Sequence, residues 1–330
     1  MRADERVTLG RTGLRVTRLG LGLAALGGMF QPVSEAEAQA TIDRAWELGI
    51  RLYDTAPVYG YGRSERLAGR ALRPKPRERF TLCTKVGRLI EPGGPDTQPI
   101  WADPPPGVGP RLDYGRRAVF RSLAESLDRL GLDRIDVLHV HDPEQDYPTA
   151  LAEAYPALAE LRDRGTVGAV SLGVNHADVA ARFIREAPPP GPDCVLLAAR
   201  YTLLDQSGLA ELLPLCAARG IAVLAAGVYQ SGLLADPRPG APHGHSHVPP
   251  ALAARLRALR ALCERHAVPP LAAAVQFPLA HPAVAAVVVG ARTPAEVTGS
   301  AELLARPVPP ALWSDLRAAG LLPETAPVPG

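Results

Sequence analysis

Short apolar runs alternate with segments of helical periodicity along nearly the whole chain. The apolar runs are rich in Val, Leu and Ile and alternate little with polar residues, which is typical of strands buried on both faces. Most runs are followed by a segment whose apolar residues recur three and four positions apart, which predicts a helix. Eight strands are expected, at residues 18–24, 50–54, 80–85, 135–141, 167–174, 194–198, 221–226 and 284–289.

Helix signals separate these strands. Ser34 and Glu37 form a capping box, and the helix that it starts ends before Gly49. Helices are expected at 34–48, 64–72, 114–130, 149–164, 176–186, 208–219, 250–266, 271–279, 294–304 and 311–319.

Eight strand–helix units in 330 residues favour an α/β fold of the (β/α)₈ TIM-barrel type, as a single domain over 1–330. Strands that alternate with helices predict a parallel sheet. An open, doubly wound sheet would need the sequence GxGxxG after its first strand. Residues 20–25 supply only two of those three glycines, so the barrel is preferred.

Composition argues against several classes of protein. The formal net charge is +2, from 36 basic and 34 acidic residues. This balance gives no excess of basic residues for binding nucleic acid or an anionic membrane. No apolar stretch is long enough for a transmembrane span, and the first residues lack the apolar region of a secretory signal. The four cysteines form no CxxC, which favours free thiols in a reducing compartment. We therefore expect a cytoplasmic protein.

Ionisable residues stand at the ends of three consecutive predicted strands. Asp54 closes the second strand, Lys85 the third and His141 the fourth, and Tyr59 follows Asp54 by five residues. Because the active sites of TIM barrels lie where the strands end, these side chains are expected to converge. A lysine beside a tyrosine is expected to lower the pKa of the phenol, so that Tyr59 can exchange a proton with a carbonyl or alcohol oxygen. Asp54 would orient Lys85, and a neutral His141 would bind the substrate oxygen.

Such a site offers no nucleophile, so it suits hydride transfer with a nicotinamide. Each residue also has a structural interpretation: Asp54 alone could be a turn residue, and Tyr59 could pack on the barrel rim. His139 shares a strand face with His141, so one of the two is expected to be deeper and structural. The two histidines also resemble metal ligands, but no histidine ends strand five, six or eight to complete a site, so no metal is expected. The histidine-rich segment 243–247 is interpreted as a solvated loop.

Four segments together resemble the motifs of the aldo-keto reductase superfamily. They are Asp-Thr-Ala-Pro-Val-Tyr-Gly-Tyr-Gly-Arg-Ser-Glu at 54–65, residues 80–85, residues 135–143 ending in His-Asp-Pro, and residues 165–175. The resemblance implies an NAD(P)-dependent (β/α)₈ oxidoreductase with Tyr59 as general acid/base. The implied catalytic residues are Asp54, Tyr59, Lys85 and His141. The family's histidine directly follows the strand and precedes x-Pro, which selects His141 over His139.

The resemblance also implies cofactor contacts. Asn175, the only asparagine, matches the position that contacts the nicotinamide carboxamide, and residues 227–234 match the loop that surrounds the pyrophosphate. The further expected contacts are Gly22, Ser231, Gly232, Leu233, Gly290, Arg292, Thr293 and Glu296. Two family residues are absent: Ala198 replaces a glutamine, and Ala226 replaces the tyrosine that stacks on nicotinamide, a place that Tyr229 could take.

The last predicted strand favours NAD, with NADP as the alternative. NADP-preferring members carry a lysine and an arginine at positions that are Gly290 and Glu296 here. A carboxylate at Glu296 would repel a 2′-phosphate and could accept hydrogen bonds from a ribose diol. Arg292 leaves NADP open, because a guanidinium group suits phosphate well.

Other segments resemble the aldose dehydrogenase branch, which includes L-fucose, D-threo-aldose and galactose 1-dehydrogenases. They are residues 141–143, 172–175, 199–206 and 223–234. The resemblance implies oxidation of the anomeric C1 hydroxyl of a sugar to a lactone. Substrate contacts are expected from Trp101, Arg200 and the Pro/Gly-rich loops at about 89–113 and 235–250.

The expected partner is a small sugar or aldehyde, bound by a monomer or a small homo-oligomer. A general aldehyde or ketone reductase, or a pyridoxal reductase or dehydrogenase, is the alternative. A non-catalytic regulatory subunit that binds cofactor is a further one. The Pro-rich tail at 323–330 is either disordered or closes over the substrate.

Overall fold

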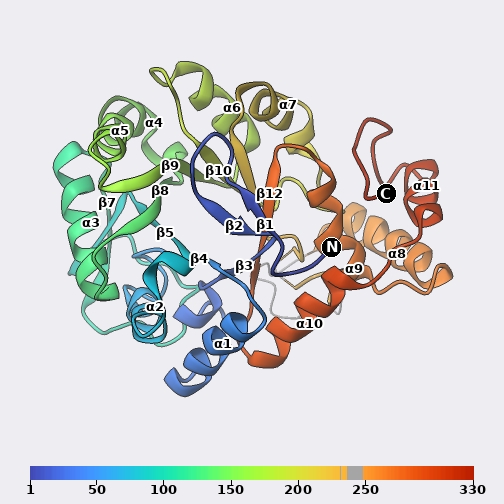
Figure 1. Ribbon diagram of the computed structural model, residues 1–330, viewed down its shortest axis with the longest axis horizontal. Helices are drawn as coiled ribbons and strands as arrows, with labels where there is room; N and C mark the ends of the chain where they lie inside the picture. The colour runs from blue at the N-terminus through green and yellow to red at the C-terminus, as the bar shows by residue number, and fades with distance from the viewer. Residues whose placement is uncertain (231, 236–247) are drawn as a thin grey trace.

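The computed structural model describes residues 1–230, 232–235 and 248–330. Eight parallel strands form a closed barrel surrounded by helices, as Figure 1 shows, which confirms the predicted (β/α)₈ fold. In order around the barrel, the strands are β3 (Leu19–Gly22), β4 (Leu52–Asp54), β5 (Thr81–Val86), β8 (Ile135–His141), β9 (Val167–Val174), β10 (Cys194–Ala198), β11 (Ala222–Ala226) and β12 (Val284–Gly290).

The helices fall close to the predicted ranges. They are α1 (Glu35–Glu47), α2 (Arg63–Leu72), α3 (Arg116–Leu130), α4 (Tyr147–Thr149), α5 (Tyr155–Asp163), α6 (Ala177–Glu186), α7 (Leu212–Arg219), α8 (Pro250–Arg265), α9 (Pro270–Gln276), α10 (Pro294–Ala305) and α11 (Pro310–Ala318). One half of the predicted capping box at α1 is formed: the Glu37 amide donates to Ser34 Oγ at 3.1 Å, which makes Ser34 the N-cap. A π-helical segment, Ala150–Ala154, joins α4 to α5. The helix predicted from residue 208 begins only at Leu212, because Ser207–Leu209 forms a separate 3-10 turn.

Two apolar clusters hold the barrel together. One lies between the strands and the helices, and the other gathers small and aliphatic side chains from the strands, such as Leu52, Val137 and Leu224. Leu9 and Val16, both fully buried, belong to the second cluster and come from outside the barrel strands. They therefore connect the N-terminal segment to the packing of the barrel.

Two β-hairpins were not predicted. Strands β1 (Arg6–Thr8) and β2 (Arg15–Thr17) pair antiparallel and lie across one end of the ring of strands (Figure 1). Strands β6 (Arg88–Pro92) and β7 (Val108–Leu112) pair antiparallel within the segment that was expected to be a Pro/Gly-rich loop. The first hairpin lies at the amino ends of the barrel strands, and the second follows the carboxyl end of β5.

The C-terminal tail packs against the body of the protein, so of the two alternatives for residues 323–330 the disordered one is wrong. Ala326 is fully buried, and Arg317 of α11 donates to its carbonyl oxygen at 2.7 Å. Arg255 of α8 also bonds the Leu321 carbonyl. Figure 1 shows the C-terminus beside α11. Among the described helices, none combines the length and apolar composition that crossing a bilayer requires.

Candidate active site

The structure brings Asp54 and Lys85 into direct contact at the carboxyl ends of neighbouring strands β4 and β5. Lys85 Nζ lies 2.7 Å from each Asp54 carboxylate oxygen and 2.8 Å from the Thr55 carbonyl oxygen. The Lys85 side chain is 1% exposed and that of Asp54 is 5% exposed. Because an ammonium group has three N–H donors, this lysine is fully bonded within the protein.

Tyr59 lies over this pair. Lys85 Nζ is 5.0 Å from the centroid of the phenol ring, and the imidazole ring of His141 meets the phenol edge-on with centroids 5.9 Å apart. Gly60 makes the loop possible: its φ is +60°, and a Cβ there would lie 2.1 Å from the Gly27 carbonyl oxygen. The close approach of the two loops therefore requires glycine. The four residues expected to converge do so.

The pKa of Tyr59 differs from the expectation. Burial is the largest influence and raises the pKa of the phenol to about 12. Lys85 lowers the pKa as expected, but the carboxylates of Asp54 and Asp142 raise it. The predicted decrease is therefore wrong for the chain by itself. At neutral pH Tyr59 is a protonated phenol, which can donate a hydrogen bond or a proton to a carbonyl oxygen.

The other ionisable groups behave as expected. Burial lowers the pKa of Lys85, but the neighbouring Asp54 and Tyr59 outweigh it and raise this pKa above its ordinary value. Asp54 has a lowered pKa because Lys85 and His139 outweigh the effect of burial. Burial, helped by Arg88 and Lys85, holds the pKa of His141 well below its usual range. The site therefore combines a charged ion pair with a neutral imidazole.

His139 is the deeper of the two histidines. It is fully buried, and its Nε2 lies 3.4 Å from Asp54 Oδ1, behind the Lys85 contact. Asp54, Cys83 and His139 lie close enough together to hold a metal ion in principle. Lys85 already places its ammonium group against both Asp54 oxygens, so a second cation there would meet direct repulsion. We assign no metal site to this cluster.

The rest of the 54–65 motif fixes the backbone around the site. Ser64 Oγ donates to the Leu23 carbonyl at 2.9 Å and shares a 2.8 Å hydrogen bond with Thr55 Oγ1. Glu65 is fully buried and accepts hydrogen bonds of 2.6 Å from Thr84 Oγ1 and from Arg129 Nε. These bonds tie helix α2 to β5 and α3, so Tyr59 sits in a loop whose two ends are both held.

Asp142 was not among the predicted site residues, although it directly follows His141. Its φ of 46° lies in the left-handed region, and its carboxylate lies between two groups. Asn175 Nδ2 donates to Oδ1 at 2.8 Å, and Arg88 Nη1 lies 2.9 Å from Oδ2. Arg200 extends the network, since its Nε donates to the Asn175 carbonyl at 2.7 Å. The predicted Asn175 and Arg200 are thus neighbours, and Asp142 and Arg88 are the residues that sequence reasoning missed.

Trp101 lies directly beside Tyr59, with ring centroids 5.6 Å apart, and is 6% exposed. Its Nε1 donates to Gln98 Oε1 at 2.9 Å. The Phe30 amide bonds the Ile100 carbonyl, so the excursion between β6 and β7 is held against the loop that follows β3. The place of Trp101 beside the phenol is compatible both with the expected substrate contact and with a role in covering apolar surface.

Small residues stand at the carboxyl ends of four strands, where the nicotinamide is expected to bind. Ala198 and Ala226 are paired in register at the ends of β10 and β11, where larger side chains would fill the space. Gly22 and Gly290 are paired at the ends of β3 and β12, and a Cβ at Gly290 would meet nothing within 4 Å. The unhindered backbone, the small side chains and the exposed amide of Asn175 fit such a cofactor.

The remaining predicted cofactor residues are placed as follows. Gly232 and Leu233 lie in a turn after β11, whereas Ser231 falls outside the described residues. Thr293 is the N-cap of α10, and its Oγ1 accepts from the Glu296 amide at 3.2 Å. Glu296 in turn accepts from the Arg292 amide at 2.7 Å, so Thr293 and Glu296 each satisfy one backbone amide at the start of α10. Tyr229 bonds Ser300 of α10 at 3.3 Å, which turns it toward that helix.

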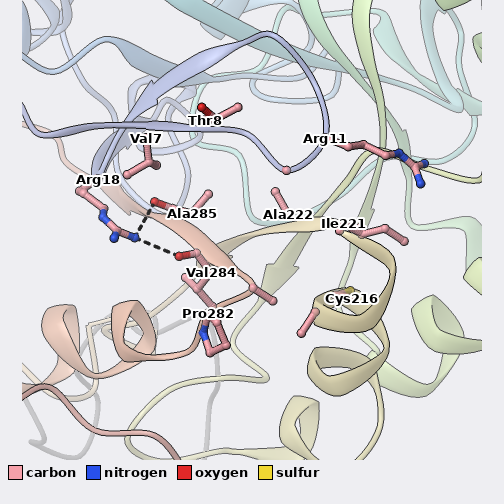
Figure 2. Close-up of a pocket in the computed structure, with 14 residues that line it drawn as sticks. Val7, Thr8, Arg11, Arg18, Cys216, Ile221, Ala222, Pro282, Val284 and Ala285 are labelled. Carbon is pink, nitrogen blue, oxygen red and sulfur yellow. Dashed lines mark hydrogen bonds between the residues drawn. The ribbon is translucent and has the colours of Figure 1, made fainter.

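A hollow of about 390 Å³ lies at the opposite end of the barrel, beside the β1–β2 hairpin (Figure 2). Arg18 lines it but donates to the Val284 and Ala285 carbonyls at 3.1 and 3.3 Å. Arg11 is bonded to the Asp193 carboxylate at 3.2 Å. The other lining residues are mostly apolar or small, and burial raises the pKa of the Cys216 thiol to about 12, so no lining group is suited to acid/base chemistry near neutral pH.

The family profile for the Aldo/keto reductase family matches residues 18–320. The chain belongs to this family. It is therefore an NAD(P)-dependent oxidoreductase, in which a nicotinamide cofactor carries the hydride. This aldo-keto reductase is 42% identical to D-threo-aldose 1-dehydrogenase of a Pseudomonas species, over 94% of this chain and 96% of that one.

Two further relatives extend the comparison. Pyridoxal 4-dehydrogenase of Microbacterium luteolum is 40% identical over 98% of this chain and 99% of its own length. L-Galactose dehydrogenase of Arabidopsis thaliana is 32% identical over 89% of this chain and 86% of its own length. Among solved structures, an aldo-keto reductase of Bacillus halodurans superposes with a TM-score of 0.77 at 24% identity, covering 96% of each chain. That likeness shows the shared fold.

Proposed function

We propose that this aldo-keto reductase oxidises the anomeric C1 hydroxyl of an aldose to a lactone, with NAD as the cofactor. The observation that carries the proposal is the convergence of Tyr59 with the Lys85–Asp54 pair and the neutral His141. The chain is 42% identical to D-threo-aldose 1-dehydrogenase and 32% identical to L-galactose dehydrogenase, which supports an aldose as the substrate. A buried phenol beside an ammonium group and a neutral imidazole suits proton exchange at an alcohol oxygen.

The roles of the four residues follow from their contacts. Tyr59, as phenolate, takes the proton of the C1 hydroxyl and becomes the neutral phenol. Lys85 stabilises negative charge on the phenol oxygen, and Asp54 fixes the Lys85 ammonium group by two bonds of 2.7 Å. His141 is neutral, so it can hydrogen-bond the substrate oxygen without adding charge. When bound, an oxidised nicotinamide would supply the hydride acceptor, and its positive charge would favour the phenolate form of Tyr59.

Asn175, Gly22, Gly232, Leu233, Gly290, Arg292 and Thr293 are proposed to hold the cofactor, together with Ser231. The preference for NAD rests on Glu296. Its carboxylate caps α10 through the Arg292 amide, so a negative charge stays fixed at this helix end. A 2′-phosphate placed there would be repelled by that charge, whereas a ribose hydroxyl could donate a hydrogen bond to it.

The test is nicotinamide reduction, followed by absorbance, with a panel of aldoses and with NAD⁺ or NADP⁺. We expect turnover of at least one aldose with NAD⁺, and its loss in Tyr59→Phe. An affinity for NADP⁺ tenfold above that for NAD⁺ would overturn the proposed role of Glu296. Failure with every aldose would overturn the substrate class.

A second candidate is oxidation of pyridoxal, which the 40% identity to pyridoxal 4-dehydrogenase favours. The Trp101 ring beside Tyr59 could face a flat heteroaromatic ring as well as a sugar. Pyridoxal therefore belongs in the same panel, and its turnover at a higher kcat/KM than any aldose would favour this candidate. A cytoplasmic location is also proposed, in keeping with four unpaired, buried cysteines.

A further inference from the structure

Arg88 faces the site, although it belongs to the hairpin rather than to the barrel. Side chains alternate between the faces of a strand, so Arg88 and Ile90 of β6 point the same way. Ile90 packs against the small cluster that contains Trp101 and has Tyr59 at its edge. Glu91, on the other face, bonds Arg111 of β7 at 2.7 Å. One face of the hairpin therefore looks onto the phenol, and Arg88 is its charged residue.

The guanidinium group of Arg88 has bonding capacity to spare. Its side chain is 10% exposed, and its contact within the described residues is the ion pair with Asp142 at 2.9 Å. This is not an aligned hydrogen bond, because Nη1 has no hydrogen-bond partner in the described part of the chain. A guanidinium group has five N–H donors, and burying them without acceptors is costly. The arrangement therefore favours a ligand that supplies acceptor oxygens.

Asp142 brings this pair to the edge of the reaction centre. It is the residue after His141, and its Oδ2 lies 3.7 Å from His141 Nε2. Its side chain is 16% exposed, so part of the carboxylate remains accessible. Asn175 holds the other carboxylate oxygen, which fixes the orientation of the group.

The charge of the pair decides which ligand fits. Arg88 offers donors and Asp142 offers acceptors, and together they carry no net charge. A hydroxyl group donates one hydrogen bond and accepts others, so it can bond both partners at once. A carboxylate or phosphate would be attracted by Arg88 but repelled by Asp142 at close range.

We propose that Arg88 and Asp142 determine substrate specificity by binding a neutral hydroxyl group of the substrate next to the reacting carbon. The inference rests on the proposed oxidation of an aldose. The apolar face of Trp101 and the polar Arg88–Asp142 pair are then two walls of one pocket, which matches a sugar with an apolar face and a hydroxylated edge. Deoxygenated and anionic analogues fit this pocket less well.

The experiment compares one aldose that the wild-type protein oxidises with its single-deoxy analogues, with NAD⁺ at saturation. We expect one analogue to lose about 10- to 100-fold in kcat/KM, as for a lost hydrogen bond to a charged group. In Arg88→Met, kcat/KM for the parent aldose should fall by a similar factor. For the affected deoxy analogue, kcat/KM should fall much less, because that analogue has no hydroxyl group for Arg88 to bind. The isosteric variant Asp142→Asn, measured in the same way, should also reduce the ratio of kcat/KM between the parent aldose and that analogue.

Arg111→Met is the matched control, since it removes an arginine from the same hairpin on the face that points away from Tyr59. Arg111→Met should keep the wild-type ratio of kcat/KM between the parent aldose and the deoxy analogue. If no deoxy analogue loses more than threefold in the wild-type protein, or if Arg88→Met lowers parent and analogues by equal factors, the inference is overturned. These outcomes leave aldose oxidation standing. If the wild-type protein oxidises no aldose, the proposed function and this inference are both overturned. If a variant does not fold, the comparison of the parent aldose with its deoxy analogues in the wild-type protein still tests the inference.

Discussion

Removal of the Lys85 ammonium group should destabilise the protein strongly. In Lys85→Met the Asp54 carboxylate loses both 2.7 Å contacts while remaining 5% exposed. Breaking a buried ion pair by removing one partner costs about 3–5 kcal/mol. At roughly 2 °C per kcal/mol for a chain of this size, Tm should fall by about 6–10 °C at pH 8. Scanning fluorimetry or calorimetry measures this shift directly.

The loss should depend on pH, with a sign that follows from linkage. In the wild type the Asp54 pKa is lowered on folding, so its contribution to stability is present above the unfolded pKa and lost as pH falls. Without Lys85, burial dominates and raises the folded pKa of Asp54 above its unfolded value. Proton uptake by Asp54, or by His139 at 3.4 Å, then stabilises the folded variant. The Tm deficit should therefore shrink between pH 8 and pH 5.

A double variant separates the lost charge from lost packing. Lys85→Met with Asp54→Asn removes the unpaired carboxylate, so most of the Tm deficit should be recovered at pH 8 although activity stays low. A Tm deficit that is the same at both pH values and unaffected by Asp54→Asn would refute the assignment of the cost to buried charge. Arg111→Met is a suitable surface control, because its side chain is 36% exposed.

Three further results are expected. Because the pKa of Tyr59 is raised to about 12, log kcat/KM for alcohol oxidation should rise with pH between about 7 and 9, and a flat profile would contradict phenolate as the base. Trp101→Ala should cost about 3–5 kcal/mol of stability and raise KM, since it removes a ring 5.6 Å from the phenol; an unchanged urea midpoint would contradict this. The buried thiols should not react with a thiol reagent until the protein is unfolded, and native labelling would contradict their placement; they are Cys83, Cys194, Cys216 and Cys263.

The barrel and the convergence of the four ionisable residues could be predicted because both depend on local sequence. Apolar runs place the strands, and parallel strands of a barrel present their carboxyl ends at one rim. Asp54, Lys85 and His141 each end such a run, so their meeting followed from topology alone. No long-range contact had to be known.

The hairpins escaped prediction for a physical reason. Strands β1 and β2 have three residues each, too few for an alternating pattern to stand out. β6 ends in Pro92, and β7 contains Pro110 opposite Ile90. Proline is normally confined to the edges of sheets, so its presence argued against strands in this segment.

The sign of the Tyr59 pKa shift was also beyond the sequence. The approach of Lys85 could be expected, but the extent of burial depends on how several loops close over the phenol. Asp142 gave a weak signal, since only the fold brings Arg88 and Asn175 to its carboxylate, from 54 residues earlier and 33 residues later in the chain.

The contacts of the N-terminal segment can be completed only late in the synthesis of the chain. Arg11 reaches its partner Asp193 across 182 residues, and Arg18 reaches the Val284 carbonyl across 266. At about 5–20 residues per second, a ribosome needs roughly 15–50 seconds between making Arg18 and making Val284. Through that interval β3 has no neighbour on one side, and such an open strand can pair with another nascent chain. A messenger truncated before β12 would therefore yield a chain in which one edge of β3 stays permanently unpaired, and aggregation is the expected fate of such a chain.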